Sequence, residues 1–579
     1  MLDIHIAILT AIIGTFLASL NYLEKYLPSF LIYLVSLLLG VSWIIHISLD
    51  QGFMNTIVTV CILVVSYFDF PFPEKSGVKN KEIIQELKEK GAKEIHIQKS
   101  KDRILLDISF SSIFVMISVL YFIFGPPSVI EFLLLFALIS LVYGMVKRIR
   151  LYRSLCVFFE QEENAFYFVS ANETKKYPLK ELNEMNMQTR PDILKLFNLF
   201  TMFSSNRDFT TSMGKTLKLS FSGENVYFTP EPSDVMFLHT ENHSMKIDEV
   251  DVKPFYHKEN WKRLLGKWYF ALTIKGVGAY AIIIVILTFI QANPYVTVLV
   301  VILFWLFNMW ISDRVLKMAL DMKEIVDPNI HSIATKVLNR AGLPYVKVYS
   351  TESSDYNGFA IGANIGQSLI ALTTQTLKLP HDAIEGILAH EAIHVKKRDV
   401  LFGQLLRILM VVITVVGLLY LHSAFPYLFK NQILIFLIIW LIIILLLPLL
   451  NSFSTQWMEV RADHLGATLL DGENDQMASS LAALYEHQLS ALENSKNYDV
   501  YKLDDEEIED EEKDEKTNAL ERETWFFRLL GFQFGTHPPM YWRVESLRST
   551  DTGWNRKKMK LWLKERLLES LPDMKSSKR

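Results

Sequence analysis

His390-Glu391-Ala392-Ile393-His394 reads H-E-x-x-H, and the interpretation of the remaining sequence starts from this pattern. A helix starting at about Pro380 is expected to carry this stretch. On an α-helix, residues four apart lie on one face, so both imidazoles can point at one ion. The glutamate between them then lies beside that ion as a candidate base, an arrangement typical of zinc metalloproteases.

The composition bounds the class of protein. Half of the 579 residues are apolar and the mean hydropathy is +0.21, although the chain also contains long charged stretches. The formal net charge of −4 provides no global basic field, so no nucleic-acid partner is expected. The two cysteines, Cys61 and Cys156, support neither a disulfide framework nor a cysteine-based metal site.

Apolar runs of bilayer-spanning length predict an α-helical multi-pass membrane protein. The predicted spans are 4–21, 29–49, 53–69, 108–124, 129–146, 268–291, 295–312, 403–423 and 431–450. The run at 53–69 is short enough to be re-entrant instead, so the expected count can differ from nine by one or two. The first run lacks a basic leader and a small-residue cleavage site, so we expect it to be retained.

Basic residues predict the orientation of these spans. They cluster in the long loops: Lys75, Lys79, Lys81, Lys88, Lys90, Lys93, Lys99, Lys101 and Arg103; Lys147, Arg148 and Arg150; Lys262, Arg263 and Lys267; Lys396, Lys397 and Arg398. The short turns between spans are nearly uncharged. The positive-inside rule therefore places the long loops and H-E-x-x-H in the cytoplasm. An odd number of spans then puts the N-terminus outside and the C-terminus inside.

Three regions follow from this pattern. Residues 1–146 form an N-terminal membrane domain of about five spans, with a soluble loop at 74–103 that reads as a helix and a short strand. Residues 147–264 form a cytoplasmic, mostly β module, because short apolar runs alternate with polar residues there. No cluster in the module suggests a site, so we expect a scaffold or regulatory role. Residues 265–579 form a membrane-embedded catalytic domain.

The catalytic domain combines four spans, near 268–291, 295–312, 403–423 and 431–450, with soluble parts at 313–400 and 451–550. A continuous helix is expected over 315–341, ended by Gly342 and Pro344. A hairpin should pair 345–349 with 358–360, and 369–373 should add a further strand. The acidic run at 504–516 is expected to be a solvated, disordered loop.

Zinc in a hydrolase needs three protein ligands and an open position for water. His390 and His394 supply two, and a third should follow on a helix that can approach them. Glu459 and Asp463 stand four apart on a probable helix, just after the last predicted span. One carboxylate can reach the metal while the other accepts the N–H of a ligating histidine. Glu391 would not bind zinc; it would take a proton from zinc-bound water and deliver it to the leaving amine.

Four blocks of sequence resemble the integral-membrane zinc metallopeptidase family that includes HtpX and the type 1 CAAX prenyl protease. The resemblance covers roughly 265–550 and leaves out the first five spans and the β module. The blocks are Asp327-Pro328-Asn329 with Asn339 to Pro344; Asn357 to Gly362; Leu388 to Val395 with Arg398-Asp399-Val400; and Glu459 to Asp463 with Thr536-His537-Pro538-Pro539, Arg543 and Leu547.

The resemblance implies a zincin-like (gluzincin) α+β catalytic domain holding one Zn²⁺ per chain. It makes Glu459 the third zinc ligand and Asp463 the partner of a ligating histidine. His537 resembles the histidine that donates to the tetrahedral oxyanion, and Arg543 one that braces active-site carboxylates. The segment Asn357, Gly358, Phe359 and Ala360 resembles an edge strand that pairs with an extended substrate backbone. Gly358 stands where alanine is usual, which should loosen this strand slightly.

These expectations describe a zinc endopeptidase in the cell membrane, in a bacterial inner membrane or a plasma membrane, with its site at the cytoplasmic face. Its partners would be the bilayer and unfolded or extended polypeptides, with membrane-protein quality control as the expected task. Maturation of a peptide or lipidated C-terminus is an alternative. A sensor-transducer that makes one regulated cut is another. A scaffold with a dead site is disfavoured, because Glu391 and the three ligands are all present.

Overall fold

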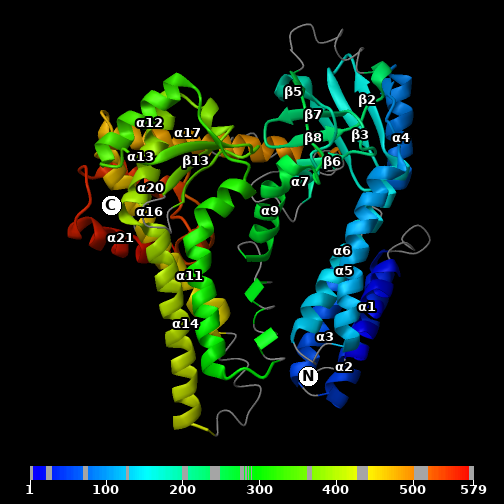
Figure 1. The fold of residues 1–579 in the computed structure, drawn as a ribbon, viewed down its shortest axis with the longest axis horizontal. Helices are drawn as coiled ribbons and strands as arrows, with labels where there is room; N and C mark the ends of the chain where they lie inside the picture. Colours follow the sequence, from blue (N-terminus) through cyan, green and yellow to red (C-terminus); the bar gives the residue numbers. More distant parts are fainter. Residues whose placement is uncertain are drawn as a thin grey trace, which may run out of the picture.

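The computed structural model describes residues 4–20, 29–51, 53–68, 76–124, 129–197, 206–234, 248–273, 279–280, 283, 286–287, 290–361, 368–426, 441–500 and 520–572. Two groups of long helices run side by side, and each carries a soluble body at its upper end (Figure 1). The body that contains β2 to β8 stands on α5 and α6. The other body, which contains α12, α13 and α16, stands on α11 and α14.

The N-terminal group consists of α1 (Ile4–Ser19), α2 (Ser29–Gln51), α3 (Phe53–Phe68), α5 (Lys101–Phe124) and α6 (Val129–Ser154). Small apolar residues such as Ala7 and Ala11 pack against Ile62 and Tyr143 in its core. The Tyr143 hydroxyl donates to the carbonyl of Ser66 across 2.9 Å, which ties α6 to α3. The Tyr143 hydroxyl is thus satisfied within the group, as an apolar environment requires.

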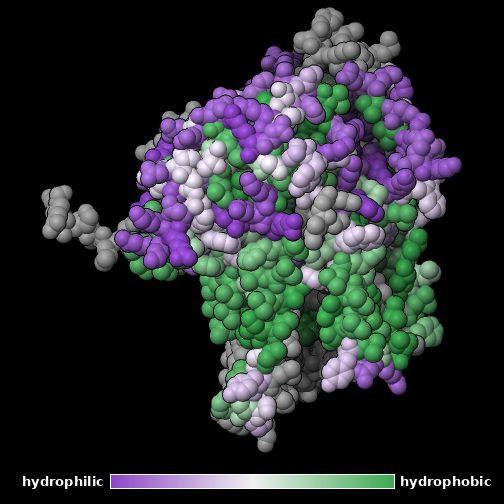
Figure 2. Space-filling model, turned by 60° about the vertical axis from the view of Figure 1, so that its left-hand side comes forward, coloured by the Kyte–Doolittle hydropathy of each residue, from purple (hydrophilic) through white to green (hydrophobic). Residues whose placement is uncertain are grey.

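Two of the described helices, Lys101–Phe124 and Tyr295–Ala319, are long and apolar enough to cross a membrane. On the face shown in Figure 2, apolar side chains form a broad band across the helical half, below a polar upper half. These features indicate a membrane protein. The predicted spans 268–291 and 431–450 lie partly outside the described residues, and the acidic run 504–516 lies wholly outside them. The number of crossings therefore stays a prediction.

The β body contains two sheets. The first has the order β1-β2-β3-β4 and is antiparallel; the second has the order β6-β8-β7-β5-β9. Their strands are β1 (Lys93–Ile95), β2 (Cys156–Glu160), β3 (Ala165–Val169), β4 (Thr174–Pro178), β5 (Leu182–Gln188), β6 (Asn206–Phe209), β7 (Thr216–Phe221), β8 (Asn225–Phe228) and β9 (Asp248–Val250). Helix α4 (Ser76–Glu89) packs outside β3, and α7 (Ile193–Leu196) precedes β6. Since β1 pairs with β2, the loop 74–103 contributes to this sheet and does not stand apart in the first domain.

The core of the β body is aromatic and includes a residue from the other body. Helix α17 (Glu473–Asn497) crosses from one body to the other (Figure 1) and ends at Tyr498, which is 1% exposed among the core residues. The Tyr498 hydroxyl lies 2.6 Å from Glu181 Oε2, and its ring centroid lies 4.7 Å from that of Tyr177. Its carbonyl accepts from the Lys176 N–H across 2.8 Å. A residue of the second body therefore completes the core of the β body.

Ion pairs reinforce this connection. Glu352, which follows β11 in the second body, contacts both Lys195 and Lys218 of the β body. Burial raises the pKa of Glu352, but the two lysines outweigh burial and hold that pKa well below its usual range. On the opposite side, Asp208 pairs with Arg103 of α5 at 2.8 Å and with Arg148 of α6 at 3.3 Å. The β body is thus held both to the N-terminal group of helices and to the second body.

The second body surrounds a mixed sheet with helices. Its elements are α9 (Trp261–Thr273), α11 (Pro294–Ala319), β10 (Lys323–Glu324), α12 (Pro328–Ala341), β11 (Lys347–Thr351), β12 (Gly358–Ile361), β13 (Leu369–Thr373), α13 (His381–Lys397), α14 (Asp399–Ala424), α16 (Leu447–Ala467), α17, α19 (Trp525–Phe534), α20 (Met540–Ser549) and α21 (Arg556–Glu569). A π-helical turn, Ile442–Leu446, precedes α16, and 3₁₀ turns occur at Leu179–Glu181, Lys258–Asn260 and Thr376–Lys378.

The predicted continuous helix over 315–341 is wrong. Helix α11 ends at Ala319, and Asp321 then adopts a left-handed conformation with φ of 51°. Helix α12 begins anew at Pro328, where the Asp327 side chain caps the N–H of Asn329 across 2.8 Å. Proline lacks the N–H that a continuing helix needs and suits a first turn. The break makes room for β10.

The predicted hairpin between 345–349 and 358–360 is also wrong. The sheet has the order β10-β11-β13-β12, so β13 lies between the two expected partners. It pairs parallel with β11 and antiparallel with β12. All five residues of β13 are buried, as suits a central strand, whereas three of the four residues of β12 are half-buried. This order leaves β12 at the edge.

Replacing Tyr498 by alanine should destabilise the β body by about 3–5 kcal/mol, as for large aromatic residues lost from cores. Tyr498→Phe should cost about 1 kcal/mol, because it removes only the hydroxyl contact. Denaturant titration of the full chain, followed by limited proteolysis of the β body, would measure both. Tyr256→Ala is the control, since Tyr256 is 67% exposed. Wild-type stability of Tyr498→Ala would contradict the role of Tyr498 in the core of the β body.

Candidate metal centre and active site

Helix α13, which carries H-E-x-x-H as predicted, is buried along nearly its whole length. Ala389 and Ala392 are fully buried, and α12, α16 and α17 pack around the helix. Gly466 of α16 lies so close that a Cβ there would be 3.2 Å from the His390 backbone nitrogen. This close approach lets the short glutamate side chain of α16 reach the histidines of α13.

The three predicted ligands converge. His390 Nε2 and His394 Nε2 lie 3.0 Å apart. Glu459 presents Oε2 at 3.4 Å from the former and Oε1 at 3.3 Å from the latter. One ligand atom from each residue lies within 4.8 Å of the other two.

The opposite nitrogen of each imidazole contacts a carboxylate. His390 Nδ1 lies 2.8 Å from Asp463 Oδ1, and His394 Nδ1 lies 2.8 Å from Asp399 Oδ2. The hydrogen bond to Asp399 keeps a proton on Nδ1 of His394 and turns the lone pair of its Nε2 inward. The Asp463 carboxylate beside Nδ1 of His390 favours the same tautomer for that ring. Two inward nitrogens 3.0 Å apart are stabilised by a proton or a metal cation that both lone pairs can contact. The donor set therefore fits a metal ion, and two histidines with one glutamate and an open position suit zinc.

Arg543 and Asp463 form a buried pair behind this centre. Arg543 donates from Nε across 2.8 Å and from Nη2 across 2.7 Å to the two carboxylate oxygens of Asp463. Burial raises the pKa of Asp463, but Arg543 and His390 lower it to about 2. Asp463 is therefore charged and can accept from His390. Arg543 Nη2 also lies 3.5 Å from Glu459 Oε2, which places it as a brace for both acids.

No role was predicted for Asp399, although Arg398-Asp399-Val400 lies just after the motif. Arg398 adopts a left-handed conformation with φ of 55° that ends α13, and α14 starts at the next residue. The turn brings the Asp399 carboxylate back to His394, which simple helical spacing does not predict. Arg461 of α16 contacts the other oxygen of Asp399. Asp399 thus links the second histidine to the helix of the third ligand.

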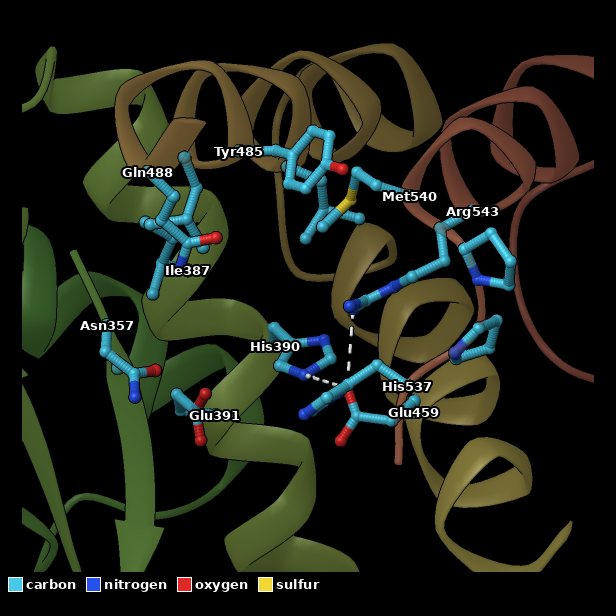
Figure 3. A pocket seen from close by; sticks show the side chains of 15 residues that line it. Asn357, Ile387, His390, Glu391, Glu459, Tyr485, Gln488, His537, Met540 and Arg543 are labelled. Atoms are coloured by element: carbon cyan, nitrogen blue, oxygen red, sulfur yellow. Dashed lines mark ion pairs between the residues drawn. The ribbon is translucent and has the colours of Figure 1, made fainter. Parts of the chain in front are cut away.

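Glu391 and His537 lie on the accessible side of the centre. Figure 3 shows Asn357 and Glu391 on one side and Arg543 and His537 on the other, with His390 and Glu459 between them. Glu391 is 7% exposed, while the His537 side chain is 60% exposed and its Nδ1 lies 2.9 Å from Glu459 Oε2. Both side chains line the cavity beside the centre, where a bound molecule would meet them.

Two cavities flank the centre and form one cleft. Their volumes are about 330 Å³ and 350 Å³. The residues common to both are Asn357, Gly358, His390, Glu391, Glu459 and His537. One cavity continues beneath α17, along Leu481, Leu484 and Tyr485, and the other continues along Val400, Gly403 and Gln404 of α14. The part played by α17 was not visible in the sequence, because it depends on how that helix folds back over α13.

The predicted substrate segment forms an accessible edge of this cleft. Asn357 precedes β12, and Gly358, Phe359 and Ala360 belong to that edge strand. A Cβ on Gly358 would lie 2.9 Å from Ile387 Cγ2 and 3.0 Å from Leu372 Cδ2. The glycine therefore lets α13 approach the strand closely, a role that the expectation of a looser strand did not include.

Comparison with known proteins finds two families along the chain. Residues 324–551 match the model of peptidase family M48, and residues 156–244 match the bacterial PH domain. The first match covers the cleft and all the predicted site residues, in agreement with the predicted HtpX-like resemblance. The bacterial PH domain match falls on the β body, for which the sequence predicted a mostly β module and no family.

Proteins described as protease HtpX homologues are among the similar curated sequences. The homologue of Pelotomaculum thermopropionicum is 37% identical over 102 residues, which are 17% of this chain and 36% of that protein. The homologue of Ralstonia nicotianae is 36% identical over 103 residues, with the same two shares. The chain thus spans about a third of the length of these relatives.

Glu459→Ala removes a ligand, so zinc content measured by elemental analysis should fall to background. Asp399→Ala removes only the partner of His394, so the chain should still bind one zinc, about 10- to 100-fold more weakly. Glu545→Ala, exposed on α20, is the matched control and should bind zinc as wild type does. Unchanged zinc content in Glu459→Ala would refute its role as a ligand.

Proposed function

Residues 324–551 belong to peptidase family M48, and from this we propose that the chain is a membrane-embedded, zinc-dependent endopeptidase. The observation that carries the proposal is the convergence of His390, His394 and Glu459 beside Glu391, in a cleft bordered by the edge strand β12. A dead scaffold would not need the carboxylate partners that orient both histidines.

Each of these residues of the cleft has a separate role in peptide hydrolysis. Zinc, held by His390, His394 and Glu459, would lower the pKa of a bound water to about 7 and polarise the scissile carbonyl. Glu391 takes a proton from the attacking water and then delivers it to the leaving amine. His537, exposed in the cleft, donates to the carbonyl oxygen as it gains negative charge. Arg543 keeps Asp463 charged, so that His390 stays oriented.

The substrate is an extended polypeptide segment. An extended chain can add to the edge strand β12 through backbone hydrogen bonds, which do not select among side chains. The cleft continues on both sides of the centre, as cleavage within a chain requires. One end reaches the start of α14, a helix predicted to span the membrane. This position favours misfolded membrane proteins as substrates.

The site faces the cytoplasm in our proposal. Lys396 and Lys397 end the motif helix, and Arg398 follows them immediately before α14. Basic residues at this position favour the cytoplasmic side of a span. The apolar band in Figure 2 lies below the polar half that contains the cleft, consistent with a site just outside the bilayer.

A regulated protease that makes one signalling cut is the second candidate. This candidate is favoured by α17, which lines the cleft with Leu484 and Tyr485. Tyr498, the residue after α17, lies in the core of the β body. Comparing membranes that contain the wild type with membranes that contain Glu391→Gln distinguishes the two. Quality control predicts that many membrane proteins accumulate in the variant, whereas a signalling protease predicts one.

Glu391→Gln should retain zinc, because Glu391 is not a ligand, and should lower the rate of peptide cleavage by about 10²- to 10⁴-fold through loss of the general base. Degradation of an unfolded protein by the purified full chain measures this rate. Glu385→Gln is a matched control on the same helix, buried and away from the zinc ligands. Full activity of Glu391→Gln would exclude the mechanism.

A further inference from the structure

Helix α19 presents an apolar face to its surroundings. Phe526, Phe527, Leu530 and Phe534 lie on this face, and their exposed fractions range from 38% to 59%. Arg528 and Phe532, on the opposite face, are almost fully buried. The usual arrangement of an amphipathic helix on a soluble body is therefore inverted, since the apolar face points outward. A contiguous apolar surface of this kind marks an interaction site.

The orientation of α19 is held by hydrogen bonds. Arg528 donates to the carbonyls of Glu523 at 2.8 Å and Glu569 at 3.0 Å. On α16, Gln456 Nε2 donates to the carbonyls of Gly531 at 2.8 Å and Gly535 at 2.9 Å. Rolling the helix to bury its phenylalanines would break these bonds and expose a buried guanidinium.

Helix α21 extends the same surface and adds positive charge. Leu567, Leu568 and Leu571 are more than half exposed at its C-terminal end, where Arg528 of α19 contacts it. Arg556, Lys557, Lys560 and Lys564 are exposed along its N-terminal part. Residues 555–571 contain six basic and two acidic residues, a net charge of +4 in a chain whose formal net charge is −4.

The surface lies where the apolar band begins. Helix α19 docks on α16 at Ser452 and Gln456, directly after the predicted span 431–450. Leu446, Leu450 and Phe453 of the preceding turns are exposed and apolar. Figure 1 places α21 level with the upper end of α14, and the apolar band of Figure 2 ends at the corresponding height.

We propose that α19 and the C-terminal end of α21 lie in the interface of the bilayer, parallel to its surface. This inference rests on the proposed membrane location. The exposed phenylalanines and leucines enter the boundary of the acyl chains, Trp525 lies at headgroup depth, and the lysines of α21 contact anionic headgroups. A lipid surface explains both features together, because an apolar face beside a basic one is the pattern of interfacial helices.

This placement has a consequence for the cleft. His537 follows α19 by three residues, and Gln456 of α16 precedes Glu459 by three. A helix fixed at the interface therefore holds the oxyanion donor and the third ligand at a set height above the acyl chains. Segments of membrane proteins that emerge from the bilayer would reach the metal centre after a short stretch of extended chain.

Quenching of a fluorescent label by lipids tests the proposal. A cysteine at Leu530, introduced with Cys61→Ser and Cys156→Ser, is labelled with a polarity-sensitive dye in full-length protein reconstituted into phosphatidylcholine–phosphatidylglycerol vesicles. Spin labels are placed on the acyl chains near the headgroup or near the bilayer centre. Leu492→Cys on α17 and Leu409→Cys on α14 are matched controls, since all three leucines are helical and 40% to 52% exposed.

We expect the shallow spin label to quench position 530 several-fold more than position 492, and to quench it more than the deep label does. Position 409 should respond strongly to the deep label.

Quenching at 530 no greater than at 492, with 409 responding, would overturn the proposal and indicate a protein partner or a second copy of the chain. Quenching at 530 by the deep label equal to that at 409 would also overturn it. Absence of quenching at both position 530 and position 409 would refute the membrane location, independently of any peptidase activity. Zinc content of each variant checks that it has folded.

Discussion

The close approach of α13 and α16 is the constraint on which the rest of the structure depends. His390 and His394 come from one helix and Glu459 from the other, and their ligand atoms meet only because Gly466 lets the two backbones nearly touch. The two imidazole nitrogens lie 3.0 Å apart, and the surrounding charged groups hold the rings in this position. Asp399, Asp463 and Arg543 do so from three further points of the chain.

The same helices connect the centre to the bodies around it. Helix α17 packs on α13 and lines the cleft, and Tyr498 after it lies in the core of the β body. Helix α19 is bonded to α16 and turns its aromatic face outward near the apolar band. The cleft is therefore connected to the β body through α17 and to the proposed lipid surface through α19. Both connections meet at helices that carry or line the metal centre.

Local patterns were predictable wherever the chemistry depends on residues close together in sequence. H-E-x-x-H on a helix places two candidate ligands and a candidate base by spacing alone, and Gly342 ended α12 where its left-handed preference predicted. The prediction failed where a long-range choice decides. Leu369–Thr373 took the central place in the sheet because it is buried throughout, which displaced the expected hairpin. Asp399 reached His394 only through a left-handed residue at Arg398.

The sequence by itself determined the chemistry of the centre: the donor types, the base and the apolar runs that predict a membrane, because each is a property of composition or helical spacing. Helical spacing left open which of Glu459 and Asp463 would reach the metal, and the tertiary structure shows Glu459 facing both histidines and Asp463 behind one of them. Only the tertiary structure decided that β13 lies between β11 and β12, and that Tyr498 belongs to the core of another body. These relations join residues that are tens to hundreds of positions apart. They follow from how helices and strands pack, and packing depends on the shapes of all the neighbours at once.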